Sequence, residues 1–432
     1  MEDVHVSRLS NGLTVLIQEA HAAPVAAFWV WYRVGSRNER PGLTGISHWV
    51  EHMLFKGTPA HPPGMLTRLV DRLGGRWNAF TWKDYTAYFE LLPAAHIDVA
   101  VRLEADRMQN TIFDDQVVGS ERTVIISERE GAENFPSYSL YEEVEALAFK
   151  VHPYRQPVIG WKTDLRLITR DDLYGHYRAY YHPANAIIVA VGDFDAAHMA
   201  DAVAGAFDPV PAGKSSSGVR AEEPPQEGER RTVLRRPGGA TAYFLQAFHT
   251  PAAAHPDVPA LMVLSGLLAG FRLLPFDGGT GGRSSRLYRA LVDGGLATDI
   301  DVGFRPSIDP ALLHISATVR TGIDVAAVEK AVDQELMRLH HEPVEPVELD
   351  RVKRQAKAQV VYLRDGVFRR ALALGVSAVV DRPEALSSLA QAVDRITVDD
   401  VTQVARTYLV ERNRTVGWYV PDPAGSSRES LS

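Results

Sequence analysis

A polar segment near the middle of the chain constrains its fold most. Residues 208–231 contain several prolines and glycines, three consecutive serines and scattered charges, which is the composition of a linker. Strand pairs and helix runs are expected in a similar order on its two sides, although residue identity between the halves is faint. Because 432 residues are too many for one ordinary hydrophobic core, we predict two domains of similar fold, residues 1–208 and 232–432, joined by a linker at 209–231.

Hydrophobic periodicity predicts both strands and helices in each half of the chain. In the first half we expect strands at residues 13–17, 26–34 and 186–191, a hairpin or edge strand at 77–90, and helices at 46–56, 65–73, 97–109, 114–133 and 171–181. In the second half we expect strands at residues 241–249, 311–319 and 415–420, and helices at 258–270, 284–292, 325–339 and 347–363. The sequence therefore predicts an α+β protein in which each domain is an antiparallel-rich sheet flanked by helices.

Composition narrows the function classes. The chain has no cysteine, which excludes disulfides, thiolate metal sites and cysteine nucleophiles. A net charge of −8 argues against binding to nucleic acid. No apolar run reaches the roughly 18 residues that a membrane helix needs, so no membrane contact is expected. The polar start of the chain shows no signal peptide, so we expect a cytoplasmic protein, or a periplasmic one if a leader has been removed.

The segment from His48 to His52, which reads His-Trp-Val-Glu-His, is the strongest functional signal. Two histidines four residues apart lie on one face of a helix, and Glu51 projects toward the same side. Neutral imidazoles at that spacing can share one zinc ion, while the glutamate takes a proton from a zinc-bound water. The order is the inverse of the more common His-Glu-x-x-His zinc signature. The alternative is a surface helix with two histidines and a solvated glutamate.

Several motifs together resemble the pitrilysin (M16) family of zinc metallopeptidases, especially its processing-peptidase-like branch. The zinc motif continues as Met-Leu-Phe-Lys-Gly-Thr, and the resemblance extends along nearly the whole chain. The other similar motifs are Asn78-Ala79-Phe80-Thr81, His152-Pro153-Tyr154, Tyr181-His182-Pro183-Ala184-Asn185, Gly192-Asp193 and Ser285-Arg286-Leu287. The resemblance implies the two-domain fold of the M16 and LuxS-like metallohydrolases and a zinc-dependent endopeptidase that cleaves peptides or unfolded segments.

The resemblance also assigns roles to individual residues of the metal site. His48 and His52 would be zinc ligands, and Glu51 the general base. The third ligand of the family is a glutamate about 76 residues after the second histidine, which is Glu128. Glu121, seven residues earlier, matches a second carboxylate that supports the site, and such outer groups orient metal ligands. The alternative for both glutamates is a solvated helix face, with Glu130 and Glu133 as neighbouring acidic residues.

A substrate strand is implied as well. The stretch Asn78, Ala79 and Phe80 resembles the edge strand on which peptides of the family bind in extended form, through backbone hydrogen bonds. Such binding would tolerate many side chains and favour short or unfolded peptides. The alternative is an ordinary edge strand without a substrate.

The second half departs from the family pattern. Active members carry an arginine and a tyrosine there that help to bind the substrate, whereas the corresponding positions are Val292 and Thr298. We therefore expect a heterodimer in which a homologous subunit supplies the Arg/Tyr pair. A homodimer is the alternative, and a non-catalytic structural subunit of a larger complex is the alternative from another class. The four intact residues, His48, Glu51, His52 and Glu128, argue against the structural role.

The glycine-rich run at residues 277–282 is a weak signal. It follows no clear Rossmann strand and lacks the lysine of a phosphate-binding loop, so a nucleotide site is not expected. A flexible loop or hinge is the preferred interpretation.

Overall fold

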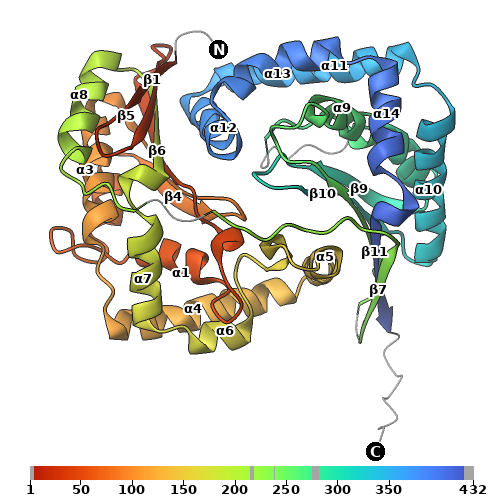
Figure 1. The fold of residues 1–432 in the computed structure, drawn as a ribbon, viewed down its shortest axis with the longest axis horizontal. Helices are drawn as coiled ribbons and strands as arrows, with labels where there is room; N and C mark the ends of the chain where they lie inside the picture. Colours follow the sequence, from red (N-terminus) through yellow and green to blue (C-terminus); the bar gives the residue numbers. More distant parts are fainter. Residues whose placement is uncertain (1–3, 215–217, 238, 275–281, 423–432) are drawn as a thin grey trace, which may run out of the picture. The chain divides into compact units, whose positions relative to one another are not determined.

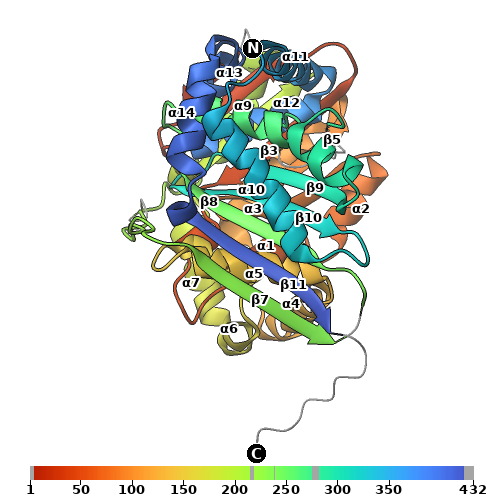
Figure 2. The ribbon, with the colours of Figure 1, turned by 90° about the vertical axis from the view of Figure 1, so that its right-hand side faces the viewer.

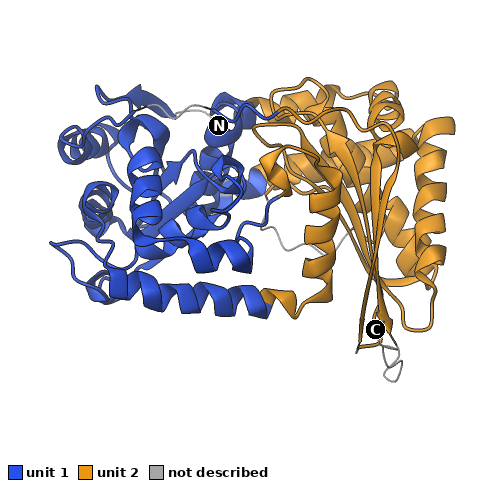
Figure 3. Cartoon of the chain, turned by 60° about the horizontal axis from the view of Figure 1, so that its bottom comes forward, with its two compact units in different colours: residues 1–131, 156–221, 361–387 blue, residues 132–155, 222–360, 388–432 orange. Residues whose placement is uncertain are grey.

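The chain forms two compact units, each of which contains segments from both halves of the sequence. The computed structural model describes residues 4–214, 218–237, 239–274 and 282–422. Figure 3 colours the units: unit 1 comprises residues 1–131, 156–221 and 361–387, and unit 2 comprises residues 132–155, 222–360 and 388–432. Residues 277–281 of the glycine-rich run lie outside the described residues. The predicted boundaries at 208 and 231 refer to chain order and stay a prediction.

Unit 1 is built on a six-stranded sheet with the order β1-β2-β6-β3-β5-β4 (Figure 1). The central strands β3 and β6 are buried on both faces, which explains their nearly continuous apolar sequences. The strand β4 is the outermost on one side, as expected for the segment 77–90. The strands are β1 (His5–Arg8), β2 (Thr14–Glu19), β3 (Val25–Tyr32), β4 (Arg76–Thr81), β5 (Thr86–Pro93) and β6 (Ala186–Gly192).

Unit 2 is built on a five-stranded sheet with the order β7-β11-β8-β10-β9. Figure 2 shows α10 and α14 over the near face of this sheet, and both helices contact β8. The strands are β7 (Arg230–Pro237), β8 (Tyr243–Thr250), β9 (Ala297–Phe304), β10 (Ala311–Val319) and β11 (Arg414–Asp422). Together the two sheets and their helices confirm the predicted α+β class with two similar sheets.

Helices complete both units. In the first half of the chain they are α1 (Ile46–Met53), α2 (Met65–Arg72), α3 (Ile97–Asn110), α4 (Asp115–Glu133), α5 (Pro136–Ala148), α6 (Lys162–Leu167), α7 (Arg170–Tyr180) and α8 (Ala196–Phe207). In the second half they are α9 (Val258–Ala269), α10 (Val325–His341), α11 (Pro346–Tyr362), α12 (Val367–Val380), α13 (Glu384–Arg395) and α14 (Val398–Tyr408). A π-helical segment, Tyr288–Asp293, overlaps the helix predicted at 284–292. No helix in the described ranges is long and apolar enough to cross a membrane.

The two sheets share one connectivity, which supports an internal duplication. Strands β2 to β6 pair in the same pattern as β7 to β11, including one parallel pair in each sheet. Both α7 and α14 begin with a capping box, from Thr169 and from Thr397. Sixteen residues after each threonine, Asn185 and Asn413 donate to the backbone carbonyl of Tyr180 and of Tyr408. The repeat is therefore most visible in capping and turn residues.

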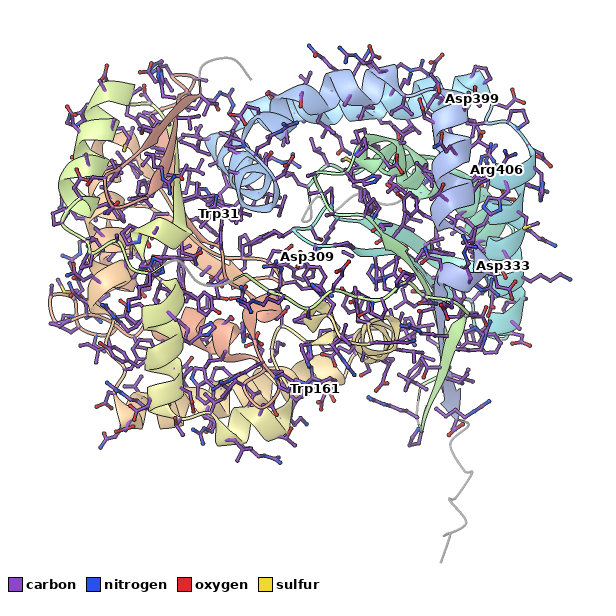
Figure 4. The ribbon with its side chains drawn as sticks, in the orientation of Figure 1. Trp31, Trp161, Asp309, Asp333, Asp399 and Arg406 are labelled. Carbon is purple, nitrogen blue, oxygen red and sulfur yellow. The ribbon has the colours of Figure 1, made fainter. Side chains whose placement is uncertain are left out.

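Each unit also takes one helix from the other half of the chain. Helix α5 packs on β7, β8 and β11 in unit 2, and α12 packs on β3 and β6 in unit 1. In β3, Phe28 and Val30 face the core that α1 and α3 cover, whereas Trp29 and Trp31 face α12 (Figures 1 and 4). Helix α12 thus closes the second face of the unit 1 sheet.

Close packing at Gly375 of α12 leads to the first prediction. A Cβ atom at this position would lie 2.1 Å from ring atoms of Trp31. We expect Gly375→Ala to lower the free energy of unfolding by about 1–3 kcal/mol, because the helix must move away from the sheet. Denaturant unfolding curves measure this loss.

The matched control is Gly205→Ala in α8, where an added Cβ meets no atom within 4 Å. The same substitution there should stabilise by about 0.5–1 kcal/mol, because alanine restricts the unfolded chain. Equal effects of the two substitutions would contradict the proposed packing of α12.

Candidate metal centre

Helix α1 is held firmly at its N-terminus. Gly45 precedes it with φ of 87°, and a Cβ at this position would lie 2.2 Å from the carbonyl oxygen of Ile159. The buried carboxylate of Glu39 accepts hydrogen bonds from the backbone N–H groups of Gly45 (2.7 Å) and Ser47 (2.8 Å). These bonds satisfy donors that the first turn of a helix leaves unpaired. The cap therefore fixes the position at which the histidine pair enters the core.

The structure brings His48, His52 and Glu128 together. The Nε2 atoms of His48 and His52 lie 3.8 Å and 3.6 Å from Oε2 of Glu128, and one ligand atom from each residue lies within 4.8 Å of the others. A tetrahedral zinc ion with ligands at about 2.0–2.1 Å separates them by roughly 3.4 Å. The donor set and its spacing therefore fit zinc. The Glu128 side chain is 46% exposed, so solvent reaches this side of the cluster.

Burial prepares His48 for a metal. The low-dielectric surroundings, with His52 as a smaller cause, lower the pKa of His48 to about 3. Its imidazole is therefore neutral at neutral pH, which is the form that binds metal ions.

Glu121 lies behind the cluster and contacts His52. Its Oε1 atom is 2.8 Å from His52 Nδ1, which leaves Nε2 of His52 directed at Glu128. Lys56 Nζ lies 2.5 Å from the other carboxylate oxygen. Burial opposes ionisation of Glu121, but the bonds to His52 and Lys56 outweigh it and lower the pKa of this carboxyl group. Glu121 is thus placed to orient a ligand rather than to serve as one.

Glu51 stands on the same helix, directed at β4. It is 7% exposed, and burial raises the pKa of Glu51 to about 7, although a hydrogen bond from Thr81 acts in the opposite direction. Thr81 Oγ1 donates to Glu51 Oε2 at 2.7 Å. A carboxyl group with a pKa near neutrality suits general acid–base chemistry. Thr81 was not among the predicted site residues, and its place directly after Asn78-Ala79-Phe80 was the signal available.

The predicted substrate residues all lie on β4. Asn78 is exposed, Ala79 is buried on the side of α1, and Phe80 packs against Trp29 and Trp31 on the opposite face. The described residues provide no further strand beside β4. Its outer edge is therefore available for pairing, and the substrate role stays a prediction.

The motif His152-Pro153-Tyr154 makes structural contacts. His152 Nε2 lies 2.9 Å from Asp309 Oδ2, and the Asp309 N–H donates to the Tyr154 hydroxyl, all within unit 2. Val292 lies inside the π-helical segment, and the exposed Thr298 lies in β9. Both of these positions also belong to unit 2, whereas the His-His-Glu cluster belongs to unit 1.

Two family models match consecutive parts of the chain. Residues 14–162 match the family model described as "Insulinase (Peptidase family M16)", and residues 167–356 match "Peptidase M16 inactive domain". The chain combines two sheets flanked by helices with a His-His-Glu cluster that could hold a metal ion. The chain belongs to the M16 peptidase family, as its motifs predicted.

Relatives span nearly the full chain. The chain is 27% identical to the mitochondrial-processing peptidase subunit beta of Lentinula edodes, over 94% of this chain and 88% of that one. It is 28% identical to the zinc protease PqqE of Helicobacter pylori, over 96% and 92%. The crystal structure of a protease from Helicobacter pylori superposes with a TM-score of 0.91 at 28% identity, covering 97% of this chain and 99% of that one. These relatives support peptidase activity at the level of the family.

The contact between Glu121 and His52 leads to the second prediction. We expect Glu121→Gln to weaken zinc binding by roughly ten- to a hundredfold, because the amide no longer pairs with Lys56 or fixes the His52 ring as firmly. Competition with a chromogenic zinc chelator measures the affinity.

Glu130→Gln is the matched control, since Glu130 also lies on α4 but its side chain is 57% exposed and pairs with Lys162 at 3.5 Å. Zinc affinity should be unchanged there. Unchanged affinity in both variants would show that Glu121 does not orient the ligand.

Proposed function

We propose that the protein is a zinc-dependent endopeptidase that hydrolyses short or unfolded peptides. The observation that carries this proposal is the hydrogen bond from Thr81 to Glu51, because it places a buried carboxyl group between the His-His-Glu cluster and the outer strand β4. His48, His52 and Glu128 would hold the zinc ion. Relatives of the chain that are named zinc proteases support that choice. A bound zinc ion would supply Lewis acidity toward water and a peptide carbonyl group.

The proton transfers would be carried out by Glu51. Thr81 occupies Oε2, so Oε1 is the atom that we assign to the proton of the attacking water. A pKa of about 7 allows the same group to accept this proton and later deliver it to the leaving amine. Strand β4 would bind the peptide backbone alongside, and Glu121 would act as a positioning residue through His52.

A homologous partner subunit would complete the substrate site. Val292 and Thr298 stand where active members of the family carry arginine and tyrosine, and valine cannot donate a hydrogen bond from its side chain. The relative from Lentinula edodes is itself named as a subunit, which supports assembly with another chain. The alternative, a non-catalytic structural subunit, is less consistent with a complete His-His-Glu cluster and with a Glu51 side chain that is hydrogen-bonded by Thr81.

Glu51→Gln provides the third prediction. The glutamine keeps the size of the side chain and an acceptor for Thr81 but cannot take up a proton. We expect kcat for peptide cleavage to fall by roughly 10²- to 10⁴-fold while zinc content stays equal to that of the wild type. Metal analysis and cleavage of a quenched fluorescent peptide measure the two quantities. Zinc bound without cleavage by the wild type, alone or with a homologous chain, would overturn the peptidase proposal.

The fourth prediction concerns the partner. A mixture of this chain with a homologous chain that carries the Arg/Tyr pair should cleave peptides at least tenfold faster than either chain alone. The control places Glu51→Gln only in this chain, which should abolish the gain because the base belongs to this subunit. Equal rates for the chain alone and for the mixture would contradict the heterodimer.

A further inference from the structure

A peptide that pairs with β4 must present its side chains alternately to the two faces of the sheet. On one face lies α1, where Thr81 binds Glu51. On the other face a hollow of about 550 Å³ opens beside the first half of β4. We propose that this hollow is a specificity subsite that takes one large aromatic or aliphatic side chain of the peptide substrate. The inference rests on the peptidase function proposed above.

The floor of the hollow is apolar. It is formed by Phe89 and Leu91 of β5 and by Phe368 of α12, and all three side chains are half-buried. The rings of Phe89 and Phe368 lie 5.0 Å apart at 78°, and each packs on Trp29, at 4.6 Å and 5.1 Å. The floor is therefore held in place by the aromatic layer beneath it, while apolar surface is left for a ligand to cover.

The walls explain why the occupant is a peptide side chain. Arg76, Trp77 and Asn78 of β4 line the hollow, so it begins at the strand whose outer edge would carry the peptide backbone. In β4, Asn78 and Phe80 alternate with Ala79 and Thr81, which face α1. A substrate residue level with Asn78 and directed away from α1 has its side chain over this floor.

The position of the hollow along β4 fixes its distance from the reacting bond. Thr81, which binds the base, is three residues beyond Asn78 and five beyond Arg76. At about 3.3 Å per residue, the subsite lies roughly 10–16 Å along the strand from Glu51. The preferred residue should therefore lie a few positions to one side of the cleaved bond rather than next to it.

The fifth prediction tests the subsite by binding. The zinc-loaded Glu51→Gln protein, which keeps the peptide uncleaved, is titrated with fluorescent peptides that differ only by Phe or Ser at each scanned position. One position should show a preference for Phe of roughly tenfold or more, the range that apolar pockets reach. Phe368→Ala in the same background should remove most of this preference.

Two controls keep the test decisive. Phe368→Leu preserves apolar packing on Trp29 and should lower the preference for Phe without unfolding the protein. Phe135→Ala removes a phenylalanine that is 65% exposed in unit 2 and should leave the preference unchanged. A preference that is absent, or that survives both Phe368 substitutions, overturns the subsite.

Cleavage assays separate this outcome from failure of the peptidase proposal. Peptides that bind with a Phe preference dependent on Phe368 but are never cleaved, with or without a homologous chain, would refute the peptidase and leave the subsite standing. Cleavage by the wild type whose Phe-to-Ser ratio of kcat/KM is the same in Phe368→Leu would refute the subsite alone.

Discussion

The hydrogen bond between Thr81 and Glu51 joins the two elements on which the site depends, helix α1 and strand β4. A buried cluster of charged side chains also contacts both elements. The Arg107 guanidinium lies 5.4 Å from the ring of Phe55, which follows α1, and 5.4 Å from that of Trp77 on β4. Arg107 also pairs with Glu104 and lies 3.5 Å from Glu90, and all three side chains of this cluster are fully buried. Burial, together with the charge of Glu104, raises the pKa of Glu90 well above its usual range.

Such a cluster is a costly way to stabilise a fold, because the ions lose their hydration. Its geometry, however, allows few alternatives: the guanidinium must meet one carboxylate and the aromatic faces together. We therefore interpret Arg107 as a residue that fixes α1 against β4. In this view the distance between Glu51 and β4 is set by the buried Arg107 cluster on one side and by the Thr81 hydroxyl group on the other.

The two units share one strand connectivity but differ in the side chains and helices at equivalent positions. Helix α9 follows β8 as α1 follows β3, but nearly all its residues are buried and apolar, and its sequence contains no histidine or glutamate. In the described residues no helix takes the place of α8 in unit 2, and Trp418 stands where unit 1 has Ala190. Trp418 donates from Nε1 to Glu329, which also pairs with Arg231. A larger side chain and an ion pair thus lie where a helix packs in unit 1. Among the described residues, the His-His-Glu cluster belongs to unit 1.

The sequence predicted those features that local patterns record. Many of the strands and helices, the α+β class and the family follow from periodicity and motifs, and the trio His48, His52 and Glu128 does meet in space. The strands β7 and β9 and the helices α12 to α14 were not predicted. Lys56 and Thr81 were named only within motifs, because their partners lie 65 and 30 residues away. The exchange of α5 and α12 between units leaves no local signal either, since an amphipathic helix looks the same whichever sheet it covers.

That exchange makes unit 1 depend on both halves of the chain. Trp29 and Trp31 are fully buried because α12 covers them, and α12 begins more than 300 residues further along the sequence. Without that helix, the sheet that carries β4 would present a large aromatic face to water, which is unfavourable by roughly 25 cal/mol for each Å² exposed. The first half of the sequence thus contains all three residues of the His-His-Glu cluster, but it lacks the helix that closes the second face of the sheet beside them. The second half, which lacks the His-Trp-Val-Glu-His motif and the Arg/Tyr pair, contributes directly to the unit that contains this cluster by covering that face.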